Sequence, residues 1–152
     1  MIDLNGKIAL VTGGGAGIGA ACSAALARVG ATVIVADRDT GAAESVAADV
    51  NGAHAMTVDV SDSASVNALI DSIIATPGRI DIGVNNAGIG GAQLGIAALT
   101  DAEWVETRSI NLDGVFYCMR AEINAMKKSG GGVIVNMASI LSVVAWPDAA
   151  PY

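Results

Sequence analysis

The sequence predicts an α/β domain built on a doubly wound parallel sheet. Five short segments rich in Val and Ile alternate with segments of helical spacing, at residues 8–11, 32–36, 54–58, 80–84 and 133–137. Apolar strands of this kind are typical of a parallel sheet that is covered on both faces by helices. A glycine-rich segment directly after the first strand indicates where a ligand binds.

The segments between the strands carry the spacing of amphipathic helices. Apolar residues recur at helical intervals over residues 18–29 and 66–74. Thr100 with Glu103 three positions later forms a capping box, so we expect a helix to begin there. This helix is expected to run to about Lys128, with the glycines at 130–132 as its stop.

Composition excludes several other classes of protein. A length of 152 residues is suited to one domain, so we expect a single domain over 1–152. The net charge is -7 and positive charges are not clustered, so we expect no nucleic-acid partner. We see no secretion signal at the N-terminus and no apolar run that approaches a membrane span. Cys22 and Cys118 lack zinc-like spacing, so we expect reduced thiols, no metal site and a cytoplasmic location.

The segment TGGGAGIG at residues 12–19 has the pattern of a dinucleotide-binding turn between strand and helix. Gly13 is suited to an unusual backbone conformation, Gly17 lets the main chain approach a pyrophosphate, and Gly19 lets the helix pack close to the strand. Free N–H groups at the helix N-terminus favour the phosphates. Because glycine turns are common, an ordinary structural turn is the alternative.

Asp37, at the end of the second strand and eighteen positions after Gly19, is the expected ribose-binding residue. A carboxylate there accepts hydrogen bonds from both ribose hydroxyls and repels a 2′-phosphate, so NAD is favoured over NADP. Arg38 argues in the opposite direction, because an arginine is able to bind that phosphate. A turn residue that caps the next helix is the alternative for Asp37.

Further motifs give the chain its resemblance to the short-chain dehydrogenase/reductase family, in the branch with the shorter subunit. The TGGGAGIG segment resembles the cofactor turn TGxxxGxG, which includes Ile18, and Asp59 with Val60 resembles the adenine-binding pair. The NNAG motif of the family is matched by Asn85, Asn86, Ala87 and Gly88. The resemblance implies the Rossmann fold with a dinucleotide-binding domain over 1–152.

The same resemblance supplies the expected catalytic residues. Asn111 in SINLDGVF matches the helix asparagine, Ser139 in IVNMAS matches the serine after the fifth strand, and Tyr152 lies thirteen positions after Ser139. Taken singly, each has a plainer interpretation: a polar helix residue, a strand-end hydroxyl and a surface aromatic. Asp59 alone is equally a helix cap and Gly88 a turn, whereas the joint order and spacing favour the family.

The resemblance implies hydride transfer between the carbon of a secondary alcohol and nicotinamide. Tyr152 is expected as the acid/base, Ser139 as the hydrogen-bond partner of the substrate oxygen, and Asn111 as the holder of a water molecule. A phenol of ordinary pKa about 10 is a poor base near neutrality, and in the family a lysine four residues after the tyrosine lowers it. We therefore expect a piece of a longer enzyme, without the last two strands, inactive by itself and tetrameric as a whole.

Two other functions remain open on the sequence. A non-catalytic or truncated dinucleotide-binding module needs the glycine turn and Asp37 but not Tyr152. A methyltransferase with a similar glycine turn explains neither NNAG nor the pair of Ser139 and Tyr152. For an enzyme, an apolar or weakly polar alcohol or ketone is expected, because residues 89–96 and 140–146 offer no charged anchor.

Overall fold

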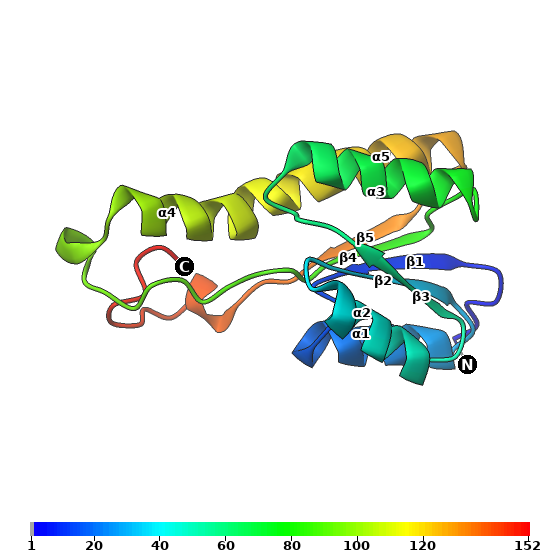
Figure 1. The fold of residues 1–152 in the computed structure, drawn as a ribbon, viewed down its shortest axis with the longest axis horizontal. Coiled ribbons are helices and arrows are strands. Elements are labelled where there is room, and N and C mark those ends of the chain that lie inside the picture. The colour runs from blue at the N-terminus through cyan, green and yellow to red at the C-terminus, as the bar shows by residue number, and fades with distance from the viewer. Residues whose placement is uncertain (1) are drawn as a thin grey trace.

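A computed structural model describes residues 2–152 and contains one parallel sheet with helices on both faces (Figure 1). The spatial order of the strands is β3-β2-β1-β4-β5, and every neighbouring pair is parallel. Each predicted strand is present, with bounds shifted by no more than two residues, so the fold class is confirmed. The strands are β1 (Ile8–Thr12), β2 (Thr32–Asp37), β3 (Ala53–Thr57), β4 (Ile82–Asn85) and β5 (Val133–Asn136).

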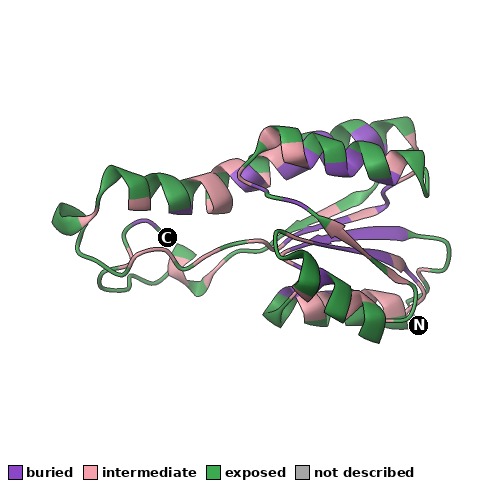
Figure 2. Ribbon diagram, in the orientation of Figure 1, coloured by how far each residue is buried: buried purple, intermediate pink, exposed green. Residues whose placement is uncertain are grey.

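The two faces of the sheet bury separate apolar clusters. Because successive strand residues point to opposite faces, Leu10 and Ile34 pack toward Ile73 and Cys118, whereas Val11 packs on the other side. Figure 2 shows the buried residues in the strands and on the inner helix surfaces. Two helices cover each face: α1 (Gly17–Arg28) and α2 (Thr40–Asp49) on one, α3 (Ser63–Ala75) and α5 (Gly114–Lys128) on the other.

The long helix predicted from Thr100 is confirmed in its start and its stop but is interrupted. Thr100 and Glu103 form the capping box, and α5 ends at Lys128 before glycines with positive φ. Between α4 (Asp101–Arg108) and α5 the chain makes a π-helical turn, Ser109–Asp113. A π turn inserts extra backbone into the helix and often marks a functional site.

The cysteines are free, as expected, with Cys22 half-buried and Cys118 buried. Burial, with a contribution from Glu122, raises the pKa of the Cys118 thiol to about 12, so this thiol stays protonated. In the described part of the chain, we find no helix that combines the length and the apolar character needed to cross a membrane.

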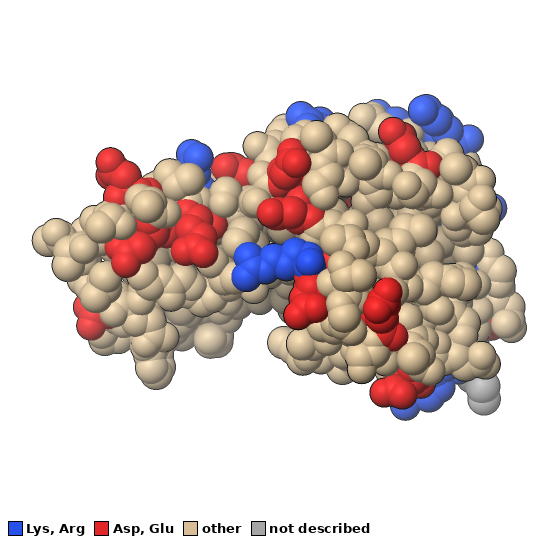
Figure 3. Space-filling view, viewed as in Figure 1, with Lys and Arg blue, Asp and Glu red and all other residues tan. Residues whose placement is uncertain are grey.

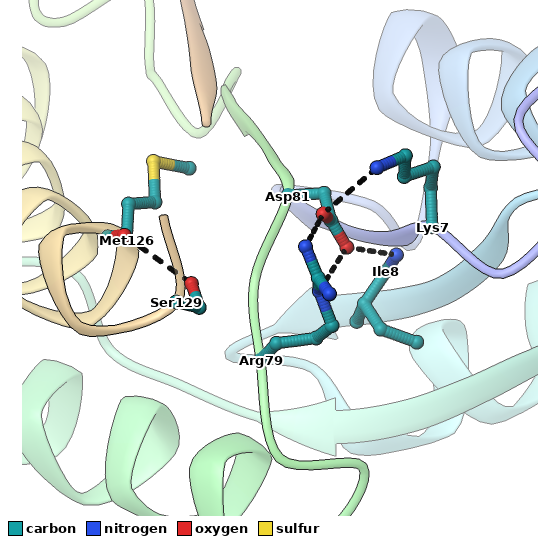
Figure 4. Close-up of polar contacts among 6 residues, drawn as sticks. All are labelled: Lys7, Ile8, Arg79, Asp81, Met126 and Ser129. Carbon is teal, nitrogen blue, oxygen red and sulfur yellow. Dashed lines mark hydrogen bonds and ion pairs between the residues drawn. The ribbon is translucent and has the colours of Figure 1, made fainter. Parts of the chain in front are cut away.

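A buried carboxylate connects the first strand to the fourth at the amino ends of the sheet (Figure 4). Asp81 accepts hydrogen bonds from the main-chain nitrogen of Ile8 at 3.0 Å and from Nε of Arg79 at 2.9 Å. Lys7 Nζ lies 3.5 Å from the same carboxylate. Burial acts to raise the pKa of Asp81, but the bonds from Ile8 and Arg79 outweigh it and lower the pKa. Figure 4 also shows Ser129 bonded to the Met126 carbonyl, where α5 ends.

We expect Asp81→Asn to lower the free energy of unfolding by about 1–3 kcal/mol at about pH 7. An acidic group whose pKa is lower in the folded protein than in the unfolded chain stabilises the folded protein at pH values above the unfolded pKa. This contribution is lost as the pH falls through the folded pKa. The difference between the two proteins therefore shrinks in urea titrations at about pH 3. Asp71→Asn, at an exposed position of α3, is the control. An equal loss at both pH values contradicts this account of Asp81.

Candidate active site

The glycine turn after β1 is held against the end of β4 by one asparagine. Asn86 Nδ2 donates to the carbonyl of Thr12 at 3.1 Å and to that of Gly13 at 3.0 Å. A Cβ on Gly13 would lie 2.8 Å from Cα of Ala87, and one on Gly19 would collide with the carbonyl oxygen of Gly13. Side chains are therefore excluded at both glycines, because the backbones of β1, α1 and the β4 end approach so closely.

The N-terminus of α1 is open for an anion. Its N-cap residue, Ala16, supplies no side-chain hydrogen bond to the first turn, and Gly17 adopts φ 53°. Unpaired N–H groups at a helix N-terminus attract phosphate. Ile18 in this turn is 62% exposed and lines a cavity at the carboxyl ends of the strands.

Asp37 ends β2 with its carboxylate tied to the glycine turn. Its Oδ2 accepts from the main-chain nitrogen of Gly15 at 2.9 Å, and Oδ1 accepts from that of Asp39 at 3.1 Å. The residue that caps α2 is Asp39 rather than Asp37, because the Asp39 side chain accepts a hydrogen bond from the main-chain nitrogen of Ala42. Asp37 is thus free of a capping role and faces the cavity.

Asp59 stabilises the turn after β3. Its Oδ1 accepts from the main-chain nitrogen and the hydroxyl of Ser61, at 2.9 and 2.6 Å, and these bonds, aided by Arg38, lower the pKa of Asp59. The N-cap of α3 is Asp62, so the capping interpretation of Asp59 is wrong. Asp59 and Val60 both lie on the cavity wall.

Asn111 lies in the π turn and fastens the loop after β4. Its Nδ2 donates to the carbonyl of Ile89 at 2.8 Å, and its Oδ1 accepts from the main-chain nitrogen of Ile89 at 2.9 Å. Both ends of the side-chain amide are thus bonded to the main chain of one residue of the cavity wall. The side chain positions Ile89 and Gly88, and the proposed water-holding role stays a prediction.

Ser139 and Tyr152 both lie on the wall of the cavity. Ser139 caps a short 3-10 turn, η3 (Ile140–Ser142), where its Oγ accepts from the main-chain nitrogen of Leu141 at 3.2 Å. The following loop returns to the loop after β4 and forms a parallel bridge between Leu94 and Ala149. This return places Tyr152, 47% exposed, on the wall of the cavity that Ser139 also lines.

The cavity has a volume of about 870 Å³ and collects most of the predicted residues. In Figure 3 the molecule is hollowed between the extension that carries α4 and the body of the sheet. Gly19 and Asn111 are absent from its wall and lie behind it, against Gly13 and Ile89. The predicted residues on the wall are Gly13, Gly17, Ile18, Asp37, Asp59, Val60, Asn86, Ala87, Gly88, Ser139 and Tyr152.

The predicted apolar wall after β5 is only partly correct. Leu141 and Trp146 line the cavity, whereas Ile140 and Val143 point to solvent and are 69% and 79% exposed. A 3-10 turn carries three residues per revolution, so consecutive side chains cannot share one face. From the loop after β4, Ile89, Gly90 and Gln93 contribute.

Sequence reasoning did not single out several wall residues. Ala16, Met137 and Ala138 lie inside the quoted motifs, whereas Val58, Ile110 and Ala149 reach the cavity through the fold alone. Arg38 also lines it, so the charged wall residues in the described chain are Asp37, Arg38 and Asp59, all on the side of the glycine turn. The side with Ser139 and Tyr152 carries neutral side chains.

The fold and this arrangement of motifs define a member of the short-chain dehydrogenase family. The family model for short chain dehydrogenases matches residues 7–152, so the chain belongs to this family. Its structure superposes on 3-ketoacyl-(acyl-carrier-protein) reductase from Brucella melitensis complexed with NADH, with a TM-score of 0.94 and 35% identity, over 99% of this chain and 64% of that one.

Among characterised relatives, the chain is 44% identical to D-threitol dehydrogenase of Mycolicibacterium smegmatis, over 98% of its own length and 58% of the relative. It is 40% identical to 3beta-hydroxysteroid dehydrogenase of Mediterraneibacter gnavus, over 96% and 54%. The chain thus spans little more than half the length of these two relatives. Their names indicate a sugar alcohol and a steroid, so relatives of similar identity differ widely in substrate.

We expect Gly19→Ala to disrupt the glycine turn, because the added methyl group would meet the main chain of Gly13 and the amide of Asn86. The free energy of unfolding should fall by about 1–3 kcal/mol, in the range of other overpacking substitutions. Gly90→Ala is a matched control on the cavity wall, since nothing lies within 4 Å of its added Cβ. Urea unfolding of both variants checks the prediction, and equal stability of the two would contradict it.

Proposed function

We propose that the protein is an NAD-dependent oxidoreductase that acts on a secondary alcohol or ketone. The observation that carries the proposal is one cavity with two different ends. The glycine turn, the open α1 terminus and Asp37 lie at one end, and Ser139 with Tyr152 lies at the other. The proposal is supported by the family and by the NADH-bound reductase of similar fold.

The residues present fit a dinucleotide. Gly17 lines the cavity and has nothing within 4 Å of an added Cβ, and Ala16 leaves the first turn of α1 without a side-chain cap. In this proposal the pyrophosphate is held at that turn, Asp37 accepts from the adenosine ribose, and Asp59 with Val60 borders the adenine. The bound nicotinamide supplies the hydride donor or acceptor.

At the other end, the side chains of this chain handle the oxygen of the substrate. In the proposed mechanism Tyr152 transfers a proton to or from that oxygen, and Ser139 donates a hydrogen bond that stabilises its developing charge. Ile89, Leu141 and Trp146 provide the apolar wall that excludes water. With Gln93 as the other polar wall residue at this end, a neutral alcohol or ketone fits better than an anion.

We further propose that the whole protein is a homo-oligomer, tetrameric by resemblance to its family. Several large apolar side chains on the α4–α5 segment are exposed, and contact with another subunit would bury them. They include Trp104 (45%), Val105 (47%), Leu112 (64%) and Phe116 (55%). An interface of this composition is typical of stable homo-oligomers.

We expect Asp37→Ser to lower the affinity for NADH about tenfold, since a ribose hydroxyl loses a charged acceptor. The affinity for NADPH should stay the same or rise, because the carboxylate no longer repels a 2′-phosphate. Fluorescence titration with both nucleotides measures this. Asp39→Ser is a matched control, because serine still caps α2 two positions away. A wild-type preference for NADPH would overturn the choice of NAD.

For catalysis, we expect Tyr152→Phe in the full-length protein to reduce kcat by at least about a hundredfold with little change in NADH affinity. D-threitol and neutral cyclic alcohols are the first substrates to assay. Tyr117→Phe, the same chemical change at a half-buried residue outside the cavity wall, serves as the matched control. If the wild type binds NADH but shows no turnover with any alcohol or ketone, the non-catalytic module is the better description.

A further inference from the structure

Glu122 is a fully buried carboxyl group on the face of α5 that packs against the sheet, 0% exposed. Its Oε2 accepts a hydrogen bond from Asn85 Nδ2 at 3.1 Å. The same Nδ2 donates to Asn136 Oδ1 at 2.9 Å. Asn85 and Asn136 are the paired last residues of β4 and β5. The three side chains therefore connect one helix to two neighbouring strand ends.

The cluster holds more acceptors than donors. Within residues 2–152, Asn85 Oδ1 and Glu122 Oε1 are buried without a hydrogen-bond partner. An unpaired buried polar atom is costly, and a buried charge is more so, whereas a proton on Oε1 removes the charge and adds a donor. Burial raises the pKa of Glu122 to about 7, although the bond from Asn85 acts to lower it.

The sheet makes room for this carboxyl group. Gly83 lies two residues before Asn85 on β4, on the same face, and a Cβ there would collide with the carboxyl of Glu122. The space between α5 and β4 is thus shaped for the acid. A glycine in the interior of a strand often marks such a close approach.

Few other charges reach this cluster. Neither β4 nor β5 contains an ionisable residue, and Asp71, the ionisable residue of α3, is exposed. On α5, the buried thiol of Cys118 lies one turn before Glu122, and burial together with Glu122 keeps its pKa high at about 12. In the adjoining π turn, Asp113 is paired with Arg108. Protonation of Glu122 is therefore the titration that changes the charge of the cluster near neutral pH.

We propose that Glu122 is a positioning residue, which acts through Asn85 and Asn136 to keep the ends of β4 and β5 aligned at the cavity. Asn86–Gly88 follow Asn85 directly, and Ser139 lies three residues after Asn136. The two segments follow neighbouring strands, and both line the cavity. The role in catalysis rests on the proposed function, but the alignment is a property of the protein without cofactor.

The first test measures amide hydrogen exchange at residues 86–88 and 137–139 without cofactor. Glu122→Leu removes the acceptor of Asn85 and should speed exchange at both segments at least about tenfold, whereas Glu122→Gln, which keeps an acceptor, should restore near wild-type rates. Ala121→Gly is the matched control: it weakens the same helix at a buried position and leaves the polar cluster intact. Asn136→Ala, at an exposed strand end, gives a milder variant with the same expected direction.

The second test follows pH. Because the pKa of Glu122 in the folded protein is about 7 and the ordinary pKa of a glutamate is 4.5, its contribution to stability is complete below about pH 4.5 and is lost as the pH rises through about 7. The urea midpoint of the wild type should therefore decline between about pH 6 and pH 8, and its affinity for NADH should decline several-fold over the same range. Both quantities should change less with pH in Glu122→Gln.

The outcomes separate this proposal from the proposed function. If no NADH binds at any pH, the proposed function fails, and hydrogen exchange still decides the role of Glu122. If Glu122→Leu and Ala121→Gly accelerate exchange at the two segments equally, or if Glu122→Gln follows the wild-type pH profile, Glu122 is a general packing residue and the positioning role is overturned. Failure of Glu122→Leu to fold leaves the decision to Asn136→Ala and Glu122→Gln.

Discussion

The site depends on a close contact between main-chain atoms at the carboxyl ends of β1 and β4, where no side chain separates the two segments. Gly13 and Gly19 admit no Cβ, and Asn86 joins the two strand ends through bonds to Thr12 and Gly13. β1 lies at the centre of the sheet, between β2 and β4, so segments on its two sides diverge there. That divergence opens the crevice in which parallel α/β sheets bind ligands.

Around this crevice, the polar side chains that are candidate ligand contacts also form hydrogen bonds to the main chain. Asp37 holds Gly15, Asp59 holds Ser61, and Asn111 holds both the main-chain N–H and the carbonyl of Ile89. Such bonds fix each side chain before any ligand arrives, which reduces the entropy lost on binding. The site is thereby preorganised on the side of the glycine turn, where the strand ends and helix starts are closest.

The sequence predicted the sheet, the capping box at Thr100 and most of the cavity wall, because these depend on local periodicity and on motifs. It did not predict the π turn, since the apolar spacing on either side of Asn111 is compatible with an uninterrupted helix. The roles of Val58 and Ile110 at the wall also escaped, because tertiary packing alone brings them there. Glu122 carries no local signal either; its significance depends on burial against Asn85, thirty-seven positions earlier.

The two ends of the cavity differ in how firmly the backbone is tied. The end with the glycine turn adjoins the ladder bonds of a five-stranded sheet, whereas the loops around Gln93 and Trp146 meet at an isolated bridge, Leu94 to Ala149, in the described chain. Segments with few main-chain bonds open at low free-energy cost. Sequence changes in this outer region can therefore accumulate without unravelling the sheet, so that the shape of the outer cavity can change in evolution while the end with the glycine turn stays constant.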